Sequence, residues 1–142
     1  MRISDVIRSK TPGVVTVRPD DTVTRLLAVL AEHRIGAIVV SEDGSDVAGI
    51  VSERDVVRRL DRDGAGILEG PGSAIMTTKV ITCEPVDSVE TLAGVMTDRR
   101  IRHVPVLADG SLYAIVSIGD IVKHRMGALQ AERDHLVGYI QQ

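Results

Sequence analysis

A chain of 142 residues with a formal net charge of −3 is one domain or two very small ones, and its acidic balance gives no general support for binding nucleic acid or an anionic membrane. No apolar run approaches the roughly 18 residues of a transmembrane helix, and the first residues do not resemble a signal peptide, so the sequence predicts a cytoplasmic protein with no membrane partner. Its one cysteine excludes an internal disulfide framework. With no Phe or Trp and only two Tyr, stacking of bases on aromatic rings is largely excluded.

The first half of the chain switches twice between the period of a strand and that of a helix. Residues 14–17 are β-branched and end at a Pro-Asp turn, which predicts a short strand. From Asp21 the apolar residues recur at i, i+3, i+4 and i+7, the stripe of an amphipathic helix, with Asp21 or Thr22 as its N-cap. The elements predicted next are a strand at 35–40, a turn at 42–44, a strand at 47–51 and a helix at 52–60.

The second half repeats the first. Residues 16–45 laid over 82–111 at a constant offset of 66 give 12 identities in 30 positions without a gap, and at offset 65 the motif Ile-Val-Ser-x-x-Asp at 50–55 recurs at 115–120. This period exceeds the roughly 20–50 residues of a solenoid unit. It therefore predicts two copies of one β-α-β-β-α unit folded against each other, with pseudo-symmetric clefts between them. The elements expected in the second copy are a strand at 80–82, a helix from 88 to about 98, strands at 103–107 and 112–117, and a helix from 118.

A glycine-rich segment joins the two copies. Its Asp-Gly-Ala-Gly and Gly-Pro-Gly stretches have the composition of a linker. Each copy alone would bury only a marginal core, so we expect the two to fold together as an α+β protein with helices covering one face of a small sheet. The predicted divisions are a first copy at 1–62, a linker at 63–72, a second copy at 73–125 and a C-terminal extension at 126–142.

The order and spacing of these elements resemble a tandem pair of cystathionine-β-synthase (CBS) domains. The resemblance rests on the doubled period of about 65 residues, on the apolar-apolar-Ser-x-x-Asp motif that closes each copy, and on residues 101–106 (Ile-Arg-His-Val-Pro-Val), which are similar to that family's strand before the hairpin. It covers residues 3–125. It implies two pseudo-symmetric CBS motifs packed as one CBS pair, or Bateman module, with a C-terminal helical extension, as in short members of the family that consist of one pair.

The resemblance also implies an adenosine ligand between the copies: AMP, ADP or ATP, and in some members NAD or S-adenosylmethionine. Asp55 and Asp120 correspond to the family's ribose carboxylate, and a carboxylate accepts from two vicinal hydroxyls at once. Ser52 and Ser117 lie at the N-termini of the same helices, where free N–H groups and the helix dipole favour phosphate. The remaining candidates are Thr16, Val17, Thr82 and Cys83 for the adenine edge, Ile35, Ala37, Ile101 and His103 for the walls of the ring, and Arg54, Arg102, His103 and Lys123 for the phosphate charge. Pro105, in the same strand as His103, is a further ligand-binding candidate.

The same residues have a purely structural interpretation. In the Ser-x-x-Asp motifs at 52–55 and 117–120, Ser can cap the helix while the acid accepts from the Ser N–H, which is a capping box. Cys83 suits a small buried hydrophobe at a strand end, because nothing nearby marks it as an activated thiol. The four His show no metal-binding spacing beyond the weak pair Asp120 and His124, so no metal site is predicted.

The two copies differ where a ligand would lie. The second has Arg-His-Val-Pro at 102–105 where the first has Gly-Ala-Ile-Val at 36–39, and Gly49 of the first is replaced by Ala114. We therefore expect one cleft to be better furnished for a charged phosphate and the other to be more permissive or empty, and the sequence leaves open which. Five further arginines are expected on solvated helix faces, namely Arg58, Arg59, Arg62, Arg99 and Arg100.

No catalytic constellation is found, since the sequence has no nucleophilic triad with supporting motifs, no Walker-type or GxGxxG loop and no Cys/His cluster. We therefore expect a regulatory, signal-transducing module and no enzyme. It would sense energy state through AMP, ADP or ATP and transmit occupancy to a dimer surface or to a regulated protein partner. Two alternatives stay open: a constitutive dimeric scaffold with vestigial clefts, and a sensor of NAD or S-adenosylmethionine. Nucleic-acid binding is disfavoured by the acidic balance and the missing aromatics.

The last helix is predicted to continue well past the point where the first copy stops. It carries an apolar stripe made of Val122, Met126, Leu129, Leu136 and Ile140. Gly127 and Gly138 weaken such a helix by up to about 1 kcal/mol each relative to Ala, so it needs support. Either the stripe packs on its own subunit or, as in the flat CBS pairs that associate as homodimers, it packs against a second copy of the chain.

Overall fold

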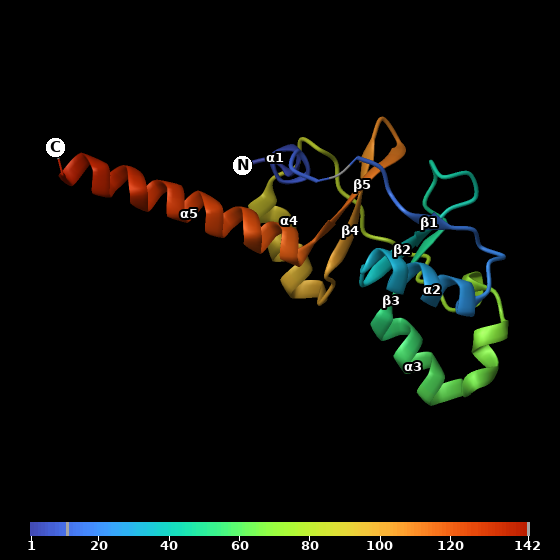
Figure 1. The fold of residues 1–142 in the computed structure, drawn as a ribbon. Coiled ribbons are helices and arrows are strands. Elements are labelled where there is room, and N and C mark those ends of the chain that lie inside the picture. Colours follow the sequence, from blue (N-terminus) through green and yellow to red (C-terminus); the bar gives the residue numbers. More distant parts are fainter. Residues whose placement is uncertain (11, 142) are drawn as a thin grey trace.

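The computed structural model describes residues 1–10 and 12–141 as two similar units followed by a projecting helix (Figure 1). The first copy contains β1 (Thr16–Val17), α2 (Val23–His33), β2 (Ala37–Val40), β3 (Gly49–Ser52) and α3 (Glu53–Asp63). The second copy contains α4 (Val89–Arg99), β4 (His103–Ala108), β5 (Ser111–Ser117) and α5 (Ile118–Ile140). A short helix, α1 (Ile3–Ile7), precedes the first copy, and two 3-10 turns, η1 (Ala65–Glu69) and η2 (Gly72–Ala74), lie between the copies. The α+β class with a C-terminal helix is confirmed.

The sheets of the two copies are related but unequal. In the first copy β1 pairs parallel with β2, and β2 pairs antiparallel with β3. In the second copy β4 and β5 pair antiparallel, and the segment that matches β1 forms only an isolated parallel bridge from Cys83 to Val106. The strand predicted at 80–82 is therefore wrong. Pairing with β4 is confined to Cys83, whose N–H donates to the Pro105 carbonyl at 3.0 Å and whose carbonyl accepts from Leu107 at 2.8 Å.

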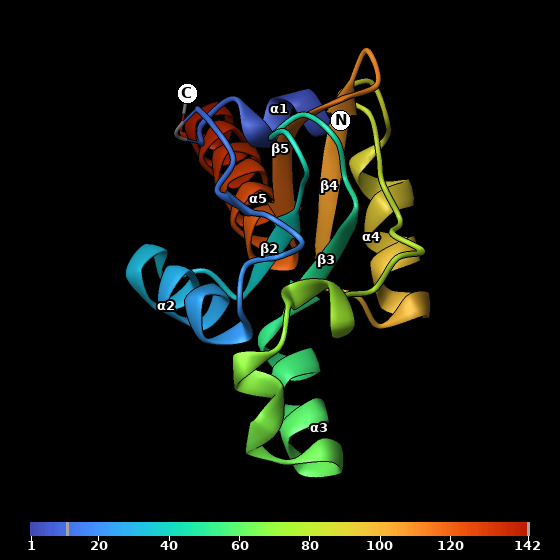
Figure 2. The same ribbon diagram turned by 90° about the vertical axis from the view of Figure 1, so that its right-hand side faces the viewer.

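The hairpins β2–β3 and β4–β5 lie next to each other at the centre of the molecule, with α2, α4 and α5 around them (Figure 2). The Leu112 N–H donates to the Ser45 carbonyl at 2.7 Å and joins the two hairpins near their turns. At the opposite end of the hairpins, Gly36 of the first copy lies against the ring of His103 of the second. The copies therefore meet along both hairpins, which places the start of α3 and the start of α5 near a common boundary.

Helices α2 and α4 begin and end in the same way. The Thr22 Oγ1 accepts the Arg25 N–H at 3.0 Å, which confirms Thr22 as the N-cap of α2, and Ser88 caps α4 by the same kind of bond. Both helices end at a residue in the left-handed conformation, Arg34 (φ 54°) in the first copy and Arg100 (φ 55°) in the second. The chain therefore turns sharply at Arg100 just before it enters β4.

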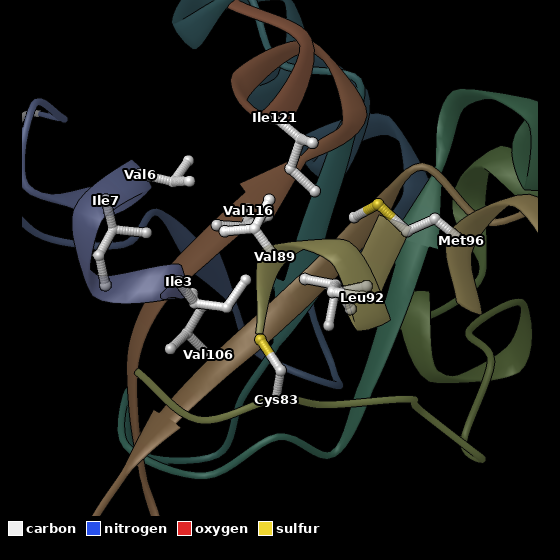
Figure 3. Close-up of a cluster of buried hydrophobic side chains, with 11 residues drawn as sticks. Ile3, Val6, Ile7, Cys83, Val89, Leu92, Met96, Val106, Val116 and Ile121 are labelled. Atoms are coloured by element: carbon white, nitrogen blue, oxygen red, sulfur yellow. The ribbon is translucent and has the colours of Figure 1, made fainter. Parts of the chain in front are cut away.

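The segment before the first copy completes the core of the second copy, and the segment between the copies completes the core of the first. Ile3, Val6 and Ile7 of α1 are buried against the second copy, in a cluster with Val89 and Val106 among others (Figure 3). The segment between α3 and α4 makes the matching contribution to the first copy, whose buried cluster includes Ile75 with Leu68 and Met76 packed against it.

The same backbone pairing holds both segments in place. Ile3 N–H donates to the Asp87 carbonyl at 2.9 Å, and Gly72 N–H donates to the Asp21 carbonyl at 2.7 Å. The N-terminal segment and the linker are thus built into the two cores as structural parts of them.

The C-terminal half of α5 projects from the body of the molecule (Figure 1). Arg125 ties the helix to α4 through an ion pair with Glu90 at 2.8 Å. Beyond it, Leu129 is 61% exposed, Leu136 55% and Ile140 80%. The interpretation in which this stripe packs on its own subunit is therefore wrong. Within the part of the chain that the structure describes, no helix is both long and apolar enough to cross a membrane.

Candidate functional site between the two copies

The two Ser-x-x-Asp motifs have nearly identical geometry. Asp55 Oδ2 accepts the Ser52 N–H at 2.8 Å while Ser52 Oγ accepts the Asp55 N–H at 3.2 Å. In the second copy Asp120 Oδ2 accepts the Ser117 N–H at 2.9 Å and Ser117 Oγ accepts the Asp120 N–H at 3.1 Å. Both motifs are capping boxes, so this interpretation of them is confirmed. No described residue donates to Oδ1 of either carboxylate, which leaves that oxygen available to an additional donor such as a hydroxyl group.

The second carboxylate has a partner that the sequence analysis missed. Lys10, between α1 and β1, donates through Nζ to Asp120 Oδ2 at 2.8 Å and to the Ile115 carbonyl at 2.6 Å. Burial acts to raise the pKa of Asp120, but the hydrogen bonds from Lys10 and Ser117 outweigh it and hold the pKa below its ordinary value. Among residues 1–10 and 12–141, no basic side chain forms an ion pair with Asp55. The two candidate ribose carboxylates are therefore in different electrostatic surroundings.

His103 lies at the boundary between the copies. A Cβ built on Gly36 would lie 3.4 Å from the His103 ring, so the imidazole occupies space that a larger residue at position 36 would fill. Burial lowers the pKa of His103, and the positive charges of Lys10 and Arg102 add to this effect. The carboxylates of Asp120 and Glu53 act to raise the pKa but do not outweigh it. A ring kept mainly neutral at physiological pH supplies little positive charge to a phosphate, so its predicted role as a wall of the site suits it better.

A cavity of roughly 510 Å³ opens where the two copies meet. Arginines from both copies line it: Arg54 from the start of α3, and Arg100 and Arg102 from the turn between α4 and β4. The remaining lining residues are Met96, Thr97, Ile101 and Ile118. The volume lies within the range of about 300–1,000 Å³ of small-molecule pockets. Because guanidinium groups match phosphate oxygens in geometry and charge, this cavity can take an anionic ligand with apolar parts.

The start of α5 adds a second feature that favours an anion. Ile118, which lines the cavity, is the first residue of α5, and Asp120 follows two residues later. The unpaired N–H groups and the positive dipole end of a helix N-terminus attract negative groups. A phosphate at Ile118 would therefore be favoured, while Asp55 and Asp120 themselves are not among the residues that line the cavity.

Some of the predicted phosphate residues gather at this cavity and others do not. Arg54 and Arg102 line it, as does Ile101 from the set predicted for the ring walls. Lys123 is exposed on α5 and is not among the lining residues. Arg100 was expected on a solvated helix face; it is exposed, but α4 ends at Arg99 and the left-handed turn brings Arg100 to the lining of the cavity.

The residues predicted to read the adenine edge are partly occupied by the sheets. The carbonyls of Val17 and Cys83 each accept an N–H group from the neighbouring strand or its continuation, at 2.8 Å. Thr16 is half-buried and Thr82 is exposed, so these two are better placed for an additional contact. Burial and, less strongly, Asp87 raise the pKa of the Cys83 thiol to about 12. Cys83 therefore acts as a buried hydrophobe, as predicted.

The other predicted wall residues belong mainly to the cores. Ile35 packs against the first copy's buried cluster, and Ala37 is buried in β2. The further candidate Pro105 is buried in β4. Across the described ranges, no group of three or more His, Cys, Asp or Glu side chains is arranged to hold a metal ion.

Comparisons with known proteins agree on one family. A sequence profile of the CBS domain matches residues 3–62 and 73–127. The chain is 36% identical over 147 residues to the mitochondrial CBS domain-containing protein CBSX3 of Arabidopsis thaliana, covering 98% of this chain and 71% of that protein. The crystal structure of the CBS-domain containing protein ATU1752 from Agrobacterium tumefaciens matches with a TM-score of 0.84 and 39% identity, over 88% of this chain and 99% of that one. The CBS domain protein PAE2072 from Pyrobaculum aerophilum, solved in complex with AMP, matches with a TM-score of 0.75 and 30% identity, over 84% and 89% of the two chains.

Proposed function

The chain belongs to the CBS-domain family, and we propose that it is a regulatory module that binds an adenosine nucleotide between its two copies. The observation that carries the proposal is the cavity that Arg54 of the first copy shares with Arg100 and Arg102 of the second. Three guanidinium groups favour a ligand with two or three phosphates over one with none. The similarity to PAE2072, which was solved with AMP, supports the class of ligand.

The position of the cavity suggests how occupancy becomes a signal. Its lining comes from both copies, so a bound nucleotide stabilises the arrangement in which Arg54 and Arg102 are close. Helix α5 starts at the cavity with Ile118 and carries the exposed stripe of Leu129, Leu136 and Ile140. We propose that this stripe packs against a second copy of the chain, because an isolated projecting helix with an apolar face is marginal in water. Nucleotide binding would then change the orientation or stability of the dimer.

A thermal-shift series tests the proposal. The ligands are adenosine, AMP, ADP, ATP, NAD and S-adenosylmethionine, with an RNA oligonucleotide as control. A ligand at about 100 times its dissociation constant adds roughly 2.7 kcal/mol to the free energy of unfolding, which for a domain near this size raises the melting temperature by roughly 5–10 °C. We expect ATP or ADP to give the largest rise. If no adenosine ligand raises the melting temperature at millimolar concentration, the proposal is refuted and the constitutive scaffold is favoured.

A further inference from the structure

The internal repeat predicts two clefts, an Asp55 cleft and an Asp120 cleft, and their candidate ribose carboxylates differ in whether a basic side chain already pairs with them. We propose that Lys10 sets the order in which the two carboxylates are used: it occupies Asp120 Oδ2, which the second of two vicinal ribose hydroxyls would need, so an adenosine ligand uses Asp55 first and Asp120 only at higher concentration. This inference rests on the proposed function and adds an order of filling to it. It assigns to the N-terminal segment a role in deciding which carboxylate is used first.

The contacts of the two carboxylates support this order. Asp120 Oδ2 accepts from both the Lys10 ammonium and the Ser117 N–H. Asp55 Oδ2 also accepts twice, but from the N–H and the hydroxyl of the same residue, Ser52. A hydroxyl can rotate and exchange its partner at little cost, since it both donates and accepts. A charge-assisted bond to an ammonium group is stronger, and the Lys10 and Asp120 side chains are only 32% and 26% exposed, so water screens this pair incompletely.

Lys10 has a second contact, to the backbone of the second copy. Its Nζ donates to the Ile115 carbonyl at 2.6 Å. Because a side chain can leave such a contact by a change of rotamer, this bond does not fix Lys10 permanently on Asp120.

The anchors of α1 do not depend on Lys10. Upstream of it, Ile3 and Val6 are anchored in the core of the second copy, and Ile3 N–H is bonded to the Asp87 carbonyl. The ion pair can therefore open without detaching α1. A ligand could therefore displace Lys10 from the Asp120 carboxylate.

The test isolates each cleft by a substitution and measures binding of adenosine and of ATP by titration calorimetry. Asp55→Asn leaves the Asp120 cleft, and Asp120→Asn leaves the Asp55 cleft; Asn can still accept the capping N–H. In the Asp55→Asn protein, Lys10→Met removes the charge and keeps most of the stem. Because a partly exposed ion pair contributes on the order of 1 kcal/mol, we expect affinity for both ligands to rise by roughly five- to tenfold. In the Asp120→Asn protein, Lys10→Met should change nothing.

Two control variants make the result specific. Arg8→Met removes a positive charge from the same segment, where Arg8 is paired with Asp5 at 3.3 Å, and it should leave affinity unchanged. Lys10→Arg keeps the charge and should retain the lower affinity of the Asp120 cleft. Melting temperatures of all variants establish that they are folded.

Each remaining outcome contradicts the inference in a distinguishable way. If the Asp120 cleft binds both ligands with the same affinity with and without Lys10, the ion pair is only structural. If Lys10→Met weakens ATP and not adenosine, Lys10 is a phosphate ligand and not a competitor. Absence of binding in every variant and in the unaltered chain would refute the proposed function itself, and the order of filling with it.

Discussion

Replacing Arg100 by Asn should weaken the binding of ATP and leave adenosine almost unaffected. Arg100 lines the cavity beside Arg54 and Arg102, and it is the residue at which α4 turns left-handed, with φ 55°. Asn is chosen because it tolerates that conformation better than other non-glycine residues, so the turn into β4 should persist. The substitution thus removes the guanidinium group while keeping the backbone.

The size of the effect follows from the exposure of the side chain. Hydrogen bonds to charged groups contribute about 1.5–3 kcal/mol, but Arg100 is exposed, and exposed ion pairs are worth at most about 1 kcal/mol. A loss of about 1 kcal/mol corresponds to about a fivefold increase in the dissociation constant for ATP. The increase should be smaller for AMP, which has one phosphate.

Titration calorimetry with ATP, AMP and adenosine measures the effect, and Arg99→Asn is the matched control. Arg99 is the preceding residue, is also exposed, and is absent from the cavity lining. Equal losses for adenosine and ATP would show that Arg100 supports the fold of the site and does not contact phosphate. Equal effects of Arg99→Asn and Arg100→Asn on ATP would attribute the loss to net charge alone.

Three further predictions concern pH, assembly and packing. Burial lowers the pKa of His103, so between that pKa and about 6.5 the unfolded chain binds more protons than the folded one. The melting temperature should therefore fall as the pH is lowered from about 7 to about 5. If the melting temperature of the His103→Gln variant falls with pH as steeply as that of the unaltered chain, this prediction is contradicted. Truncation after Met126 should convert a dimer into a monomer by light scattering, and a dimer that survives unchanged would exclude the tail as the interface. Gly49→Ala should lower the free energy of unfolding by about 1–3 kcal/mol, because its Cβ would lie 2.9 Å from the Thr77 carbonyl oxygen. Gly94→Ala in α4, where nothing lies within 4 Å, should instead stabilise by up to about 1 kcal/mol, and a destabilisation as large as that of Gly49→Ala would refute the steric argument.

The fold was predictable where the sequence carries a periodic or duplicated signal. The stripe that starts at Val23 and the caps at Thr22 and Ser88 correspond to observed helices because these signals are local. Helix α1 was not anticipated: five residues are too few to show a period, and Ile3 and Val6 are buried only by residues some eighty positions later. The contribution of the linker to the first core was missed for the same reason.

The candidate site was predictable in part. Asp55 and Asp120 could be found because they belong to a motif that occurs twice, and Arg54 because it lies inside the first of the two motifs. Lys10 could not, because it lies 110 residues from its partner Asp120 and outside the repeat. Arg100 was assigned to a solvated helix face because periodicity cannot show where the helix ends. A helix that stops at Arg99 in a left-handed turn has the same sequence pattern as one that continues through Arg100.

The sequence shows that Gly49 is replaced by Ala114 in the second copy, but only the structure gives the physical reason for this difference. A side chain at Gly49 would collide with Met76 and Thr77, in the segment between α3 and α4 that crosses the first copy at that point. The sequence suggested that this difference concerned the ligand. The structure relates it to the pairing of Thr77 with β3.

The central claim is that a nucleotide binds between the copies and uses the two repeated carboxylates. Titration calorimetry of ATP into the unaltered chain and into the Asp55→Asn, Asp120→Asn double variant tests it most directly, with the melting temperature of the variant measured in parallel. We expect binding to the unaltered chain and a loss of at least about tenfold in affinity in the double variant, since each carboxylate contributes charge-assisted hydrogen bonds to ribose worth about 1.5–3 kcal/mol. Unchanged ATP affinity in a variant that melts at a lower temperature would show that Asp55 and Asp120 serve only as helix caps, and the account of the site would be wrong.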